Sequence, residues 1–134
     1  MNIFSYLLGT WKVKKTTNNK IIIKGVLNLN RTSKDYFSFE ENVVSNFNLN
    51  LITGFKKFQI HETNYDIFFY LDNDKKDIYQ NFKKRERYIS YFFCKKDFYL
   101  MTLNIVSQNF FMIQTKIKGP KKKYNILAKY YRTI

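Results

Sequence analysis

The sequence is poor in the residues that build cross-links, metal centres and phosphate-binding loops. Its 134 residues include one cysteine (Cys94), one histidine (His61), one proline and four glycines. A single cysteine excludes an internal disulfide, and a single histidine without metal-ligand spacing around it indicates no metal site. No Gly-rich loop of the phosphate-cradling type is present. We therefore expect neither a metal nor another cofactor.

Alanine, the strongest helix former, occurs once, at Ala128. Aromatic residues supply 19% of the chain, and with the frequent Ile and Val they suit the pleated, half-buried surface of a β-sheet. We therefore expect an all-β fold. A chain of this length corresponds to one domain, residues 1–134, with a core of its own.

Acidic residues are also scarce, and the formal net charge is +14. Nine basic side chains stand against five acidic ones in residues 1–67, whereas fifteen stand against five in residues 68–134. Such a surplus attracts nucleic acid or an acidic partner. However, an A/T-rich coding sequence would give the same bias towards Lys, Asn and Ile to any protein, so the charge alone assigns no function.

Apolar and polar residues alternate along the whole chain, most cleanly in residues 47–51. Polar turns of a few residues separate the alternating segments, and such short connections favour neighbouring antiparallel strands. Roughly eight to ten twisted strands in one domain close on themselves as a barrel. The sequence thus predicts an antiparallel up-and-down β-barrel.

The apolar segment 3–8 comes before the first long strand and predicts a short helical lead-in. It is too short to span a membrane and lacks the flanks of a signal peptide. With only one cysteine, the chain suits a reducing compartment. We expect a cytoplasmic protein, or an organellar one if a transit peptide has been removed.

The two ends of the chain carry residues suited to closing a barrel. Gly9-Thr10-Trp11 begins the first long strand, and Arg132 lies near the end of the last. This pattern resembles the calycin signature of lipocalin-like barrels, in which a basic side chain from the last strand covers the indole of a Gly-x-Trp on the first. A guanidinium stacks well on an indole face. The resemblance implies a calycin-like barrel.

Other motifs resemble the family known as domain of unknown function 6314. They are Gly119-Pro120-Lys121-Lys122-Lys123-Tyr124 with Tyr131-Arg132, the segment Cys94-Lys95-Lys96-Asp97-Phe98-Tyr99, and Leu7-Leu8-Gly9-Thr10-Trp11 with Gly25. The resemblance covers nearly the whole chain and implies a calycin-like barrel without an assigned activity. Phe92 departs from the family pattern, which has a histidine there, and Thr115 stands where an aromatic is usual. A proton-transfer or metal role for that histidine is excluded here.

Tyr130 and Arg132 are the first candidates for ligand binding. Residues two apart on a strand point to the same side. If that side is the lumen, the pair holds an anionic head group by charge-assisted hydrogen bonds, in a pairing similar to that of intracellular fatty-acid-binding barrels. If Arg132 only covers Trp11, it closes the barrel, and we favour this second interpretation.

Four further residues are candidates for ligand binding, and two of them, Asp97 and Tyr99, would form a polar site at a barrel mouth with Cys94. Asp97 and Tyr99 share one strand face, although an Asp in a turn commonly bonds its own backbone. The other two candidates, Lys122 and Tyr124, belong to the family-like motif. We interpret the Gly119-Pro120 pair at the start of this motif as structural. Cys94 has no base near it in the sequence, and we interpret His61 as a solvated loop residue.

The sequence shows no paired catalytic carboxylates and no nucleophile elbow, so we do not expect an enzyme. Two functions remain open. In one, the lumen binds a small apolar or amphipathic anionic molecule. In the other, the basic C-terminal half binds RNA or an acidic partner, because Lys83–Arg87, Lys95–Lys96 and Lys121–Lys123 are interspersed with aromatic residues.

Overall fold

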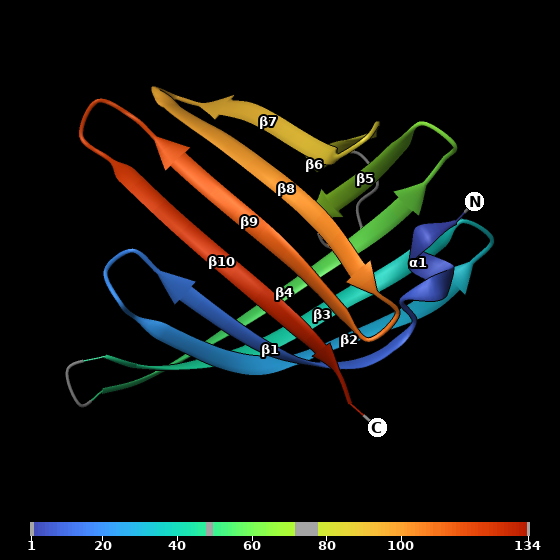
Figure 1. Cartoon of the computed structure of the whole chain (residues 1–134), viewed down its shortest axis with the longest axis horizontal. Coiled ribbons are helices and arrows are strands. Elements are labelled where there is room, and N and C mark those ends of the chain that lie inside the picture. The colour runs from blue at the N-terminus through green and yellow to red at the C-terminus, as the bar shows by residue number, and fades with distance from the viewer. Residues whose placement is uncertain (1, 48–49, 72–77, 134) are drawn as a thin grey trace.

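The computed structural model describes residues 2–47, 50–71 and 78–133. Within them lie one short helix and ten strands (Figure 1). In chain order these are α1 (Ile3–Tyr6), β1 (Gly9–Thr17), β2 (Ile22–Ser33), β3 (Tyr36–Phe47), β4 (Asn50–Glu62), β5 (Asp66–Leu71), β6 (Ile78–Lys84), β7 (Tyr88–Cys94), β8 (Asp97–Ser107), β9 (Phe110–Lys118) and β10 (Lys123–Arg132).

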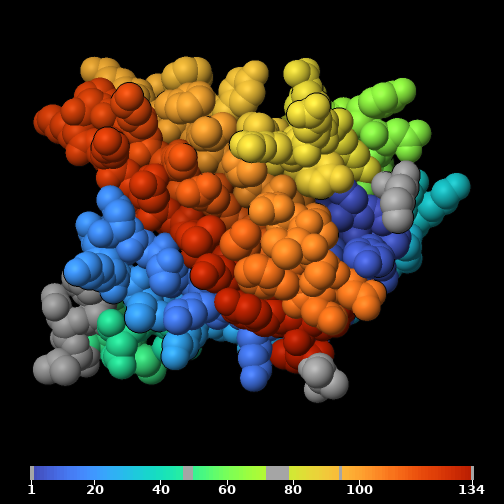
Figure 2. Space-filling view, in the orientation of Figure 1, coloured from blue at the N-terminus to red at the C-terminus, as the bar shows by residue number. Residues whose placement is uncertain are grey.

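The strands form a closed barrel in which each pairs antiparallel with its sequence neighbours and β10 returns to β1. At this seam Trp11 pairs with Arg132 and Thr17 with Ile126. Figure 2 shows the surfaces of β1 and β10 in contact. The up-and-down order and the short helix before it confirm the predicted barrel, with a strand number at the upper limit of the predicted range.

One end of the barrel, here called the closed end, holds α1, the start of β1 and the end of β10 (Figure 1). Phe4 of α1 and the following Leu7 are buried there. Trp11 is 0% exposed, and its indole Nε1 donates to the carbonyl oxygen of Leu7 at 2.9 Å. The strands add further buried apolar side chains, namely Leu27, Leu29, Phe37, Ile60, Ile67, Leu103 and Phe111. Close packing of this kind fills the lumen at the closed end.

Glu62 fastens α1 to the closed end. Its carboxylate accepts hydrogen bonds from the backbone N–H groups of Ile3 at 2.6 Å and Phe4 at 2.8 Å. It also pairs with Lys84 Nζ at 2.5 Å. A buried carboxylate is tolerated only when it is paired and hydrogen-bonded. A helix of four residues is not stable alone, so these contacts determine its position.

The opposite end, here called the open end, is bounded by the β1–β2, β7–β8 and β9–β10 turns and is less filled. Along β4 the residues facing the lumen run from Ile60, 0% exposed, through Phe58, 8% exposed, to Lys56, which is exposed. The lumen therefore changes along its length from a packed core to accessible space.

Gly25 allows β2 and β3 to approach closely near the middle of the barrel. A Cβ atom at this position would lie 2.0 Å from the carbonyl oxygen of Asn42 and 2.8 Å from the Cα atom of Val43. Neither backbone atom can move aside easily, so only glycine fits. This close approach is a physical reason for the glycine in the family-like N-terminal pattern.

Candidate ligand-binding site

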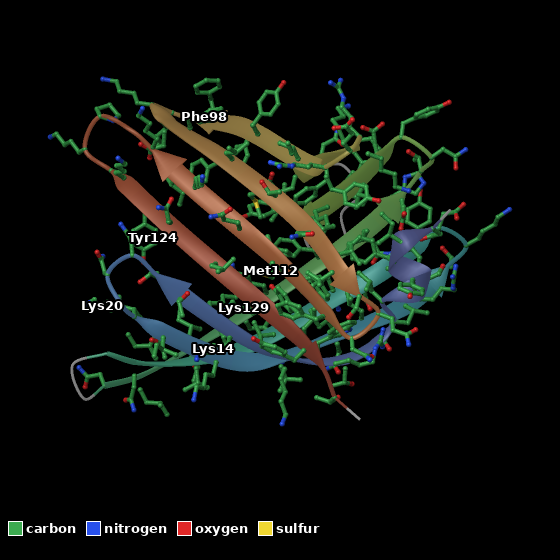
Figure 3. The ribbon with its side chains drawn as sticks, viewed as in Figure 1. Lys14, Lys20, Phe98, Met112, Tyr124 and Lys129 are labelled. Atoms are coloured by element: carbon green, nitrogen blue, oxygen red, sulfur yellow. The ribbon has the colours of Figure 1, made fainter. Side chains whose placement is uncertain are left out.

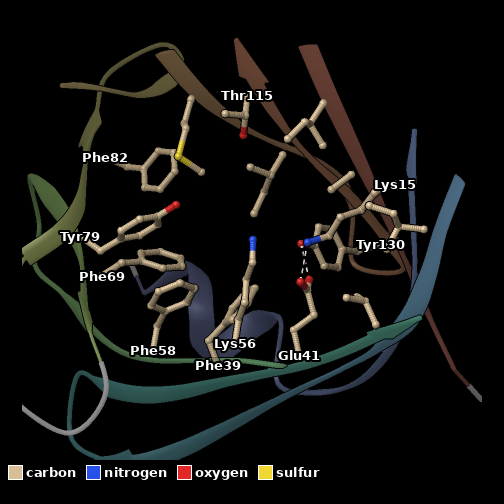
Figure 4. A pocket seen from close by; sticks show the side chains of 16 residues that line it. Lys15, Phe39, Glu41, Lys56, Phe58, Phe69, Tyr79, Phe82, Thr115 and Tyr130 are labelled. Atoms are coloured by element: carbon tan, nitrogen blue, oxygen red, sulfur yellow. Dashed lines mark hydrogen bonds and ion pairs between the residues drawn. The ribbon is translucent and has the colours of Figure 1, made fainter. Parts of the chain in front are cut away.

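A cavity of about 190 Å³ lies inside the barrel towards the open end (Figure 4). Most of its wall is apolar, with side chains that include Phe39, Phe58, Phe69, Phe82, Met101, Ile113 and Ile126. Pockets for drug-sized ligands usually measure about 300–1,000 Å³. This cavity therefore suits a small molecule, or one end of a longer molecule that projects through the open end.

Three polar side chains form a hydrogen-bonded cluster on one side of the cavity. The Glu41 carboxylate accepts from Lys15 Nζ at 2.5 Å and from the Tyr130 hydroxyl at 2.8 Å. The three side chains come from β3, β1 and β10, and all are buried. Burial, then the charge of Glu41 and the hydrogen bond with it, raise the pKa of Tyr130 well above its ordinary value. The phenol therefore remains a protonated donor at neutral pH.

Lys56 adds a second ammonium group to the cavity. In Figure 4 its Nζ points from β4 into the space between the phenylalanine rings and Glu41. Among the described residues, the ion pair that Glu41 forms is with Lys15 and not with Lys56. Burial of the amine, and then the charge of Lys15, lower the pKa of Lys56, while Glu41 partly opposes this shift. Lys56 as a whole residue is exposed, and its side chain also lines the cavity.

The charged lining residues are thus two lysines and one glutamate in an otherwise mostly apolar wall. Because Lys15 and Glu41 neutralise each other, the ammonium group of Lys56 is in excess. A charged group in apolar surroundings costs free energy unless a counter-ion or water accompanies it. The cavity can therefore accept an anionic group next to Lys56 and apolar atoms against the rings.

Aromatic rings form a continuous row along another side of the cavity. Phe58 stacks on Tyr79 with ring centroids 4.9 Å apart, and Phe69 lies 5.8 Å from Phe58. The row continues from Tyr79 to Phe92 at 6.3 Å and from Phe92 to Tyr99 at 4.7 Å. Burial, and then Tyr99, raise the pKa of Tyr79. The predicted site residue Tyr99 therefore lies near Tyr79 and is not among the cavity-lining residues.

Arg132 lies at the closed end, away from the cavity. Its guanidinium donates to the carbonyl oxygens of Leu8 at 2.5 Å, Tyr6 at 3.0 Å and Gln108 at 2.8 Å. Its Cζ atom is 4.4 Å from the centroid of the Trp11 ring. These contacts close the barrel and complete the core. Tyr130 and Arg132 share one face of β10, but the structure does not bring them together at a ligand.

Asp97 and Lys122 meet outside the lumen, where the β7–β8 and β9–β10 turns lie side by side. Lys122 Nζ is 3.4 Å from an Asp97 carboxylate oxygen. A Cβ atom at Gly119 would lie 2.0 Å from the other carboxylate oxygen. The glycine thus makes room for Asp97, which joins the two family-like motifs physically. The exposed Pro120 follows in the turn.

Tyr124 is half-buried near the open end of β10 and is not among the cavity-lining residues (Figure 3). The prediction that His61 lies in a solvated loop is wrong. It lies in β4, half-buried, with its ring stacked on Tyr36 at 4.3 Å. The side chain of Cys94 lies outside the described part of the structure.

Sequence reasoning missed the three charged lining residues, Lys15, Glu41 and Lys56. Each lies two residues from an apolar pair that faces the lumen, on the side of the open end. The pairs are Trp11/Val13 for Lys15, Phe37/Phe39 for Glu41 and Phe58/Ile60 for Lys56. Because side chains alternate along a strand, a charged residue in phase with an apolar face is the signal that identifies these positions. That signal marks a polar group in the lumen but does not tell which strands bring such groups together.

The described residues contain no group of three or more His, Cys, Asp or Glu side chains arranged to hold a metal ion. Across the same residues, no helix has both the length and the apolar character needed to cross a membrane.

The model of a family of unknown function (DUF6314) matches residues 7–132. The chain belongs to this family. The match confirms the resemblance carried by the Gly-Pro and Gly-x-Trp motifs, and it covers every strand of the barrel. None of the curated proteins matches the chain by sequence.

Solved structures share the fold of this family member at low sequence identity. An S-type phycobiliprotein lyase from Guillardia theta aligns with a TM-score of 0.72 and 9% identity over 98% of this chain and 91% of the lyase. A de novo designed fluorescence-activating β-barrel aligns with a TM-score of 0.57 and 11% identity over 99% of both chains. A redesigned β-barrel bound to DFHBI aligns with a TM-score of 0.56 and 11% identity, over 98% of this chain and 100% of the redesigned barrel. Identities this low show the fold alone, and the fold is a calycin-like barrel as predicted.

Proposed function

We propose that this barrel binds a small amphipathic anion in its lumen. The observation that carries the proposal is the uncompensated ammonium group of Lys56 in a cavity with an otherwise mostly apolar wall. An acid head group would pair with Lys56, and an apolar tail would pack against Phe58, Phe69 and Phe82. The hydroxyl of Tyr130 and the ammonium of Lys15 donate hydrogen bonds to Glu41 and hold that carboxylate in place.

Two further points support a binding role. A redesigned barrel of the same fold is bound to DFHBI, so this architecture accommodates a small molecule. In addition, no cluster of catalytic side chains was identifiable from the sequence, and we therefore propose binding without turnover.

We propose the cytoplasm as the location of the protein, since a lone cysteine suits a reducing compartment.

The proposal moves the head-group anchor from Arg132 to Lys56. Arg132 is engaged by three carbonyl oxygens and the Trp11 ring at the closed end. Redirecting it to a ligand would break all of these contacts. Among the described residues Lys56 forms no ion pair, although Lys15 and Glu41 are close enough to shift its pKa, so an incoming anion need not replace a carboxylate partner.

Calorimetric titration with octanoate and with 1-octanol tests this proposal. The two ligands have the same chain, but only octanoate is charged. We expect octanoate to bind the wild-type protein and to lose about tenfold or more in affinity in Lys56→Met, because a charged hydrogen bond contributes about 1.5–3 kcal/mol. Octanol should bind Lys56→Met at least as well as the wild type.

Lys57→Met is the matched control, because Lys57 is the next residue on β4 and points outwards to Glu40. It should leave both affinities unchanged. Equal losses in the two lysine variants, or no binding of either ligand to the wild type, would overturn the proposal.

A second candidate function is the binding of single-stranded RNA on the outer wall. Tyr91 and Phe93 of β7 are 68% and 74% exposed. The ring of Phe98, labelled in Figure 3, lies 6.3 Å from Tyr91 and 5.1 Å from Phe93. Exposed rings of this kind offer stacking surfaces for unpaired bases.

Basic residues flank these rings. Lys118 of β9 pairs with Phe98 in the sheet, and a surface depression next to Tyr91 is lined by Lys83, Arg85 and Arg87. Phosphate groups of a strand lying across the rings would meet these cations. The rings favour RNA over an acidic protein partner, because bases stack on them.

Fluorescence anisotropy with a labelled oligo(U) at several salt concentrations tests this second candidate. We expect affinity to fall steeply as salt rises. The double variant Tyr91→Ser/Phe93→Ser should bind about tenfold more weakly, whereas Tyr65→Ser, an equally exposed ring at the β4–β5 turn, should have no effect. No loss in either variant would show that charge alone drives binding, and equal losses in both would show that the β7 rings are not a specific stacking surface.

A further inference from the structure

Lys56 and Lys57 are adjacent lysines in very different surroundings. Lys57 lies on the outer wall with its Nζ 3.6 Å from a carboxylate oxygen of Glu40. Lys56 points into the cavity, where the phenylalanine rings surround it and where Glu41 is already bonded to Lys15. The alternation of side chains along β4 produces this contrast between two chemically identical residues.

The surroundings of Lys56 lower the pKa of its amine and so raise the fraction of neutral amine at a given pH. The charged or titratable groups that face it are Lys15 from β1, Glu41 from β3, Tyr79 from β6 and Tyr130 from β10. Burial, and then the charge of Lys15, lower its pKa, with Glu41 acting in the opposite direction. A desolvated lysine next to a second cation is a recognised form of activated amine nucleophile.

We propose that Lys56 captures small apolar aldehydes or ketones in this cavity as imines. The inference rests on the proposed function to the extent that both use the same cavity and the same side chain. It extends that function from reversible anion binding to covalent capture of a carbonyl compound. An aldehyde with a short alkyl chain or a single aromatic ring fits the volume and the apolar wall.

The chemistry requires no oxidant, reductant or cofactor. The lone pair of the neutral Nζ adds to the carbonyl carbon, and one proton moves from nitrogen to oxygen. Water then leaves with the second proton, and the C=N bond forms. One amine and one carbonyl compound thus give one imine and one water. The ammonium of Lys15 and the hydroxyl of Tyr130 are proton donors beside the site, and Glu41 is a counter-ion for a protonated imine.

Trapping with octanal and sodium cyanoborohydride tests the inference, because the hydride reduces the imine to a stable secondary amine. Peptide mapping by mass spectrometry then locates the added octyl group. At a pH of about 8 we expect Lys56 to be modified several-fold faster than Lys57, since its lowered pKa leaves a larger fraction of the amine neutral and the cavity holds the aldehyde beside it. Octanoate should protect Lys56 and leave Lys57 unprotected.

Control reactions use the Lys56→Met and Lys57→Met variants. The first should lose the fast modification, and the second should keep it. Equal rates at Lys56 and Lys57, or fast modification that survives in Lys56→Met, would overturn the inference. If octanoate binds but octanal is not captured at Lys56, the inference fails and the proposed function stands. If octanal is captured at Lys56 but octanoate does not bind, the anion-binding proposal fails instead.

Discussion

The two ends of the barrel hold the same kind of ion pair in different settings. At the closed end Lys84 pairs with Glu62 at 2.5 Å, and at the open end Lys15 pairs with Glu41 at 2.5 Å. Both glutamates are 1% exposed in their side chains. In each case a buried carboxylate is satisfied by one lysine and by further hydrogen-bond donors.

The difference lies in what surrounds each pair. Glu62 receives backbone donors from α1, so the helix and its Phe4 close the lumen around the pair. Glu41 receives the hydroxyl of Tyr130, and the space beside it contains an additional cation, Lys56. The same ion pair therefore anchors a plug at one end and leaves a charged, accessible cavity at the other. The next four variants are designed to separate these two roles.

Trp11→Ala should produce the largest effect, because it removes the central side chain of the closed end. We expect a loss of about 3–5 kcal/mol in the free energy of unfolding, from lost burial and from the cavity left behind. Urea denaturation measures this loss. The neighbouring exposed residue supplies a control, since Lys12→Ala should change stability by less than about 0.5 kcal/mol. A small loss in Trp11→Ala would show that the closed end is not the stabilising half.

Glu41→Gln should lower the free energy of unfolding by about 2 kcal/mol. It leaves Lys15 without its carboxylate partner, and breaking a fully buried pair costs about 3–5 kcal/mol, a cost that water entering from the open end reduces. Glu40→Gln is the matched control on the outer wall. The affinity for octanoate should rise in Glu41→Gln, because the cavity then has two free cations. A fall in affinity would mean that Glu41 holds the anion site together.

Arg132→Met should lower stability by about 1–2 kcal/mol, because it removes hydrogen bonds to three carbonyl oxygens and the stacking on Trp11. Its affinity for octanoate should stay within about twofold of the wild type. Thermal denaturation and calorimetric titration of the same preparation measure both quantities. A large loss of affinity in the folded variant would return Arg132 to the role of head-group anchor.

Lys56→Met should have the smallest effect of the four variants. Unlike the other three, it should raise the free energy of unfolding at neutral pH. The folded state lowers the pKa of Lys56, so between that lowered value and the ordinary value near 10.4 the unfolded chain binds more protons. The free energy of unfolding of the wild type therefore rises with pH across this window. The variant lacks this dependence, so it should be more stable at neutral pH and lose the advantage as pH approaches about 10.4. A constant difference across the window would contradict this account.

Much of the fold was predictable from the sequence because each strand of a β-barrel carries its own alternation of apolar and polar residues. The periodicity predicted the strands, and the resemblance of Gly9-Thr10-Trp11 and Arg132 to the calycin signature predicted the closing pair. Register and strand number required the structure. Neither the bulge between Phe69 and Tyr70 nor that between Ile105 and Ser107 has a glycine or proline to indicate it.

The site was less predictable than the fold. Tyr130 and Arg132 were correctly placed on one face of β10, yet the sequence does not show which end of the barrel is filled. Phe4 of α1 and the following Leu7 help to fill the closed end, where Arg132 lies, whereas the cavity forms beside Tyr130, two residues earlier on β10. Glu41 and Lys15 are 26 positions apart, and their meeting depends on the curvature of three strands.

The central claim is that ligand binds in the open half of the barrel while the closed half stays fixed. Chemical-shift mapping of ¹⁵N-labelled protein during titration with octanoate tests it most directly. We predict that shifts concentrate around Lys15, Glu41 and Lys56, while the indole N–H of Trp11 does not move. Shifts centred on Trp11 and Arg132, or none that saturates, would contradict the claim.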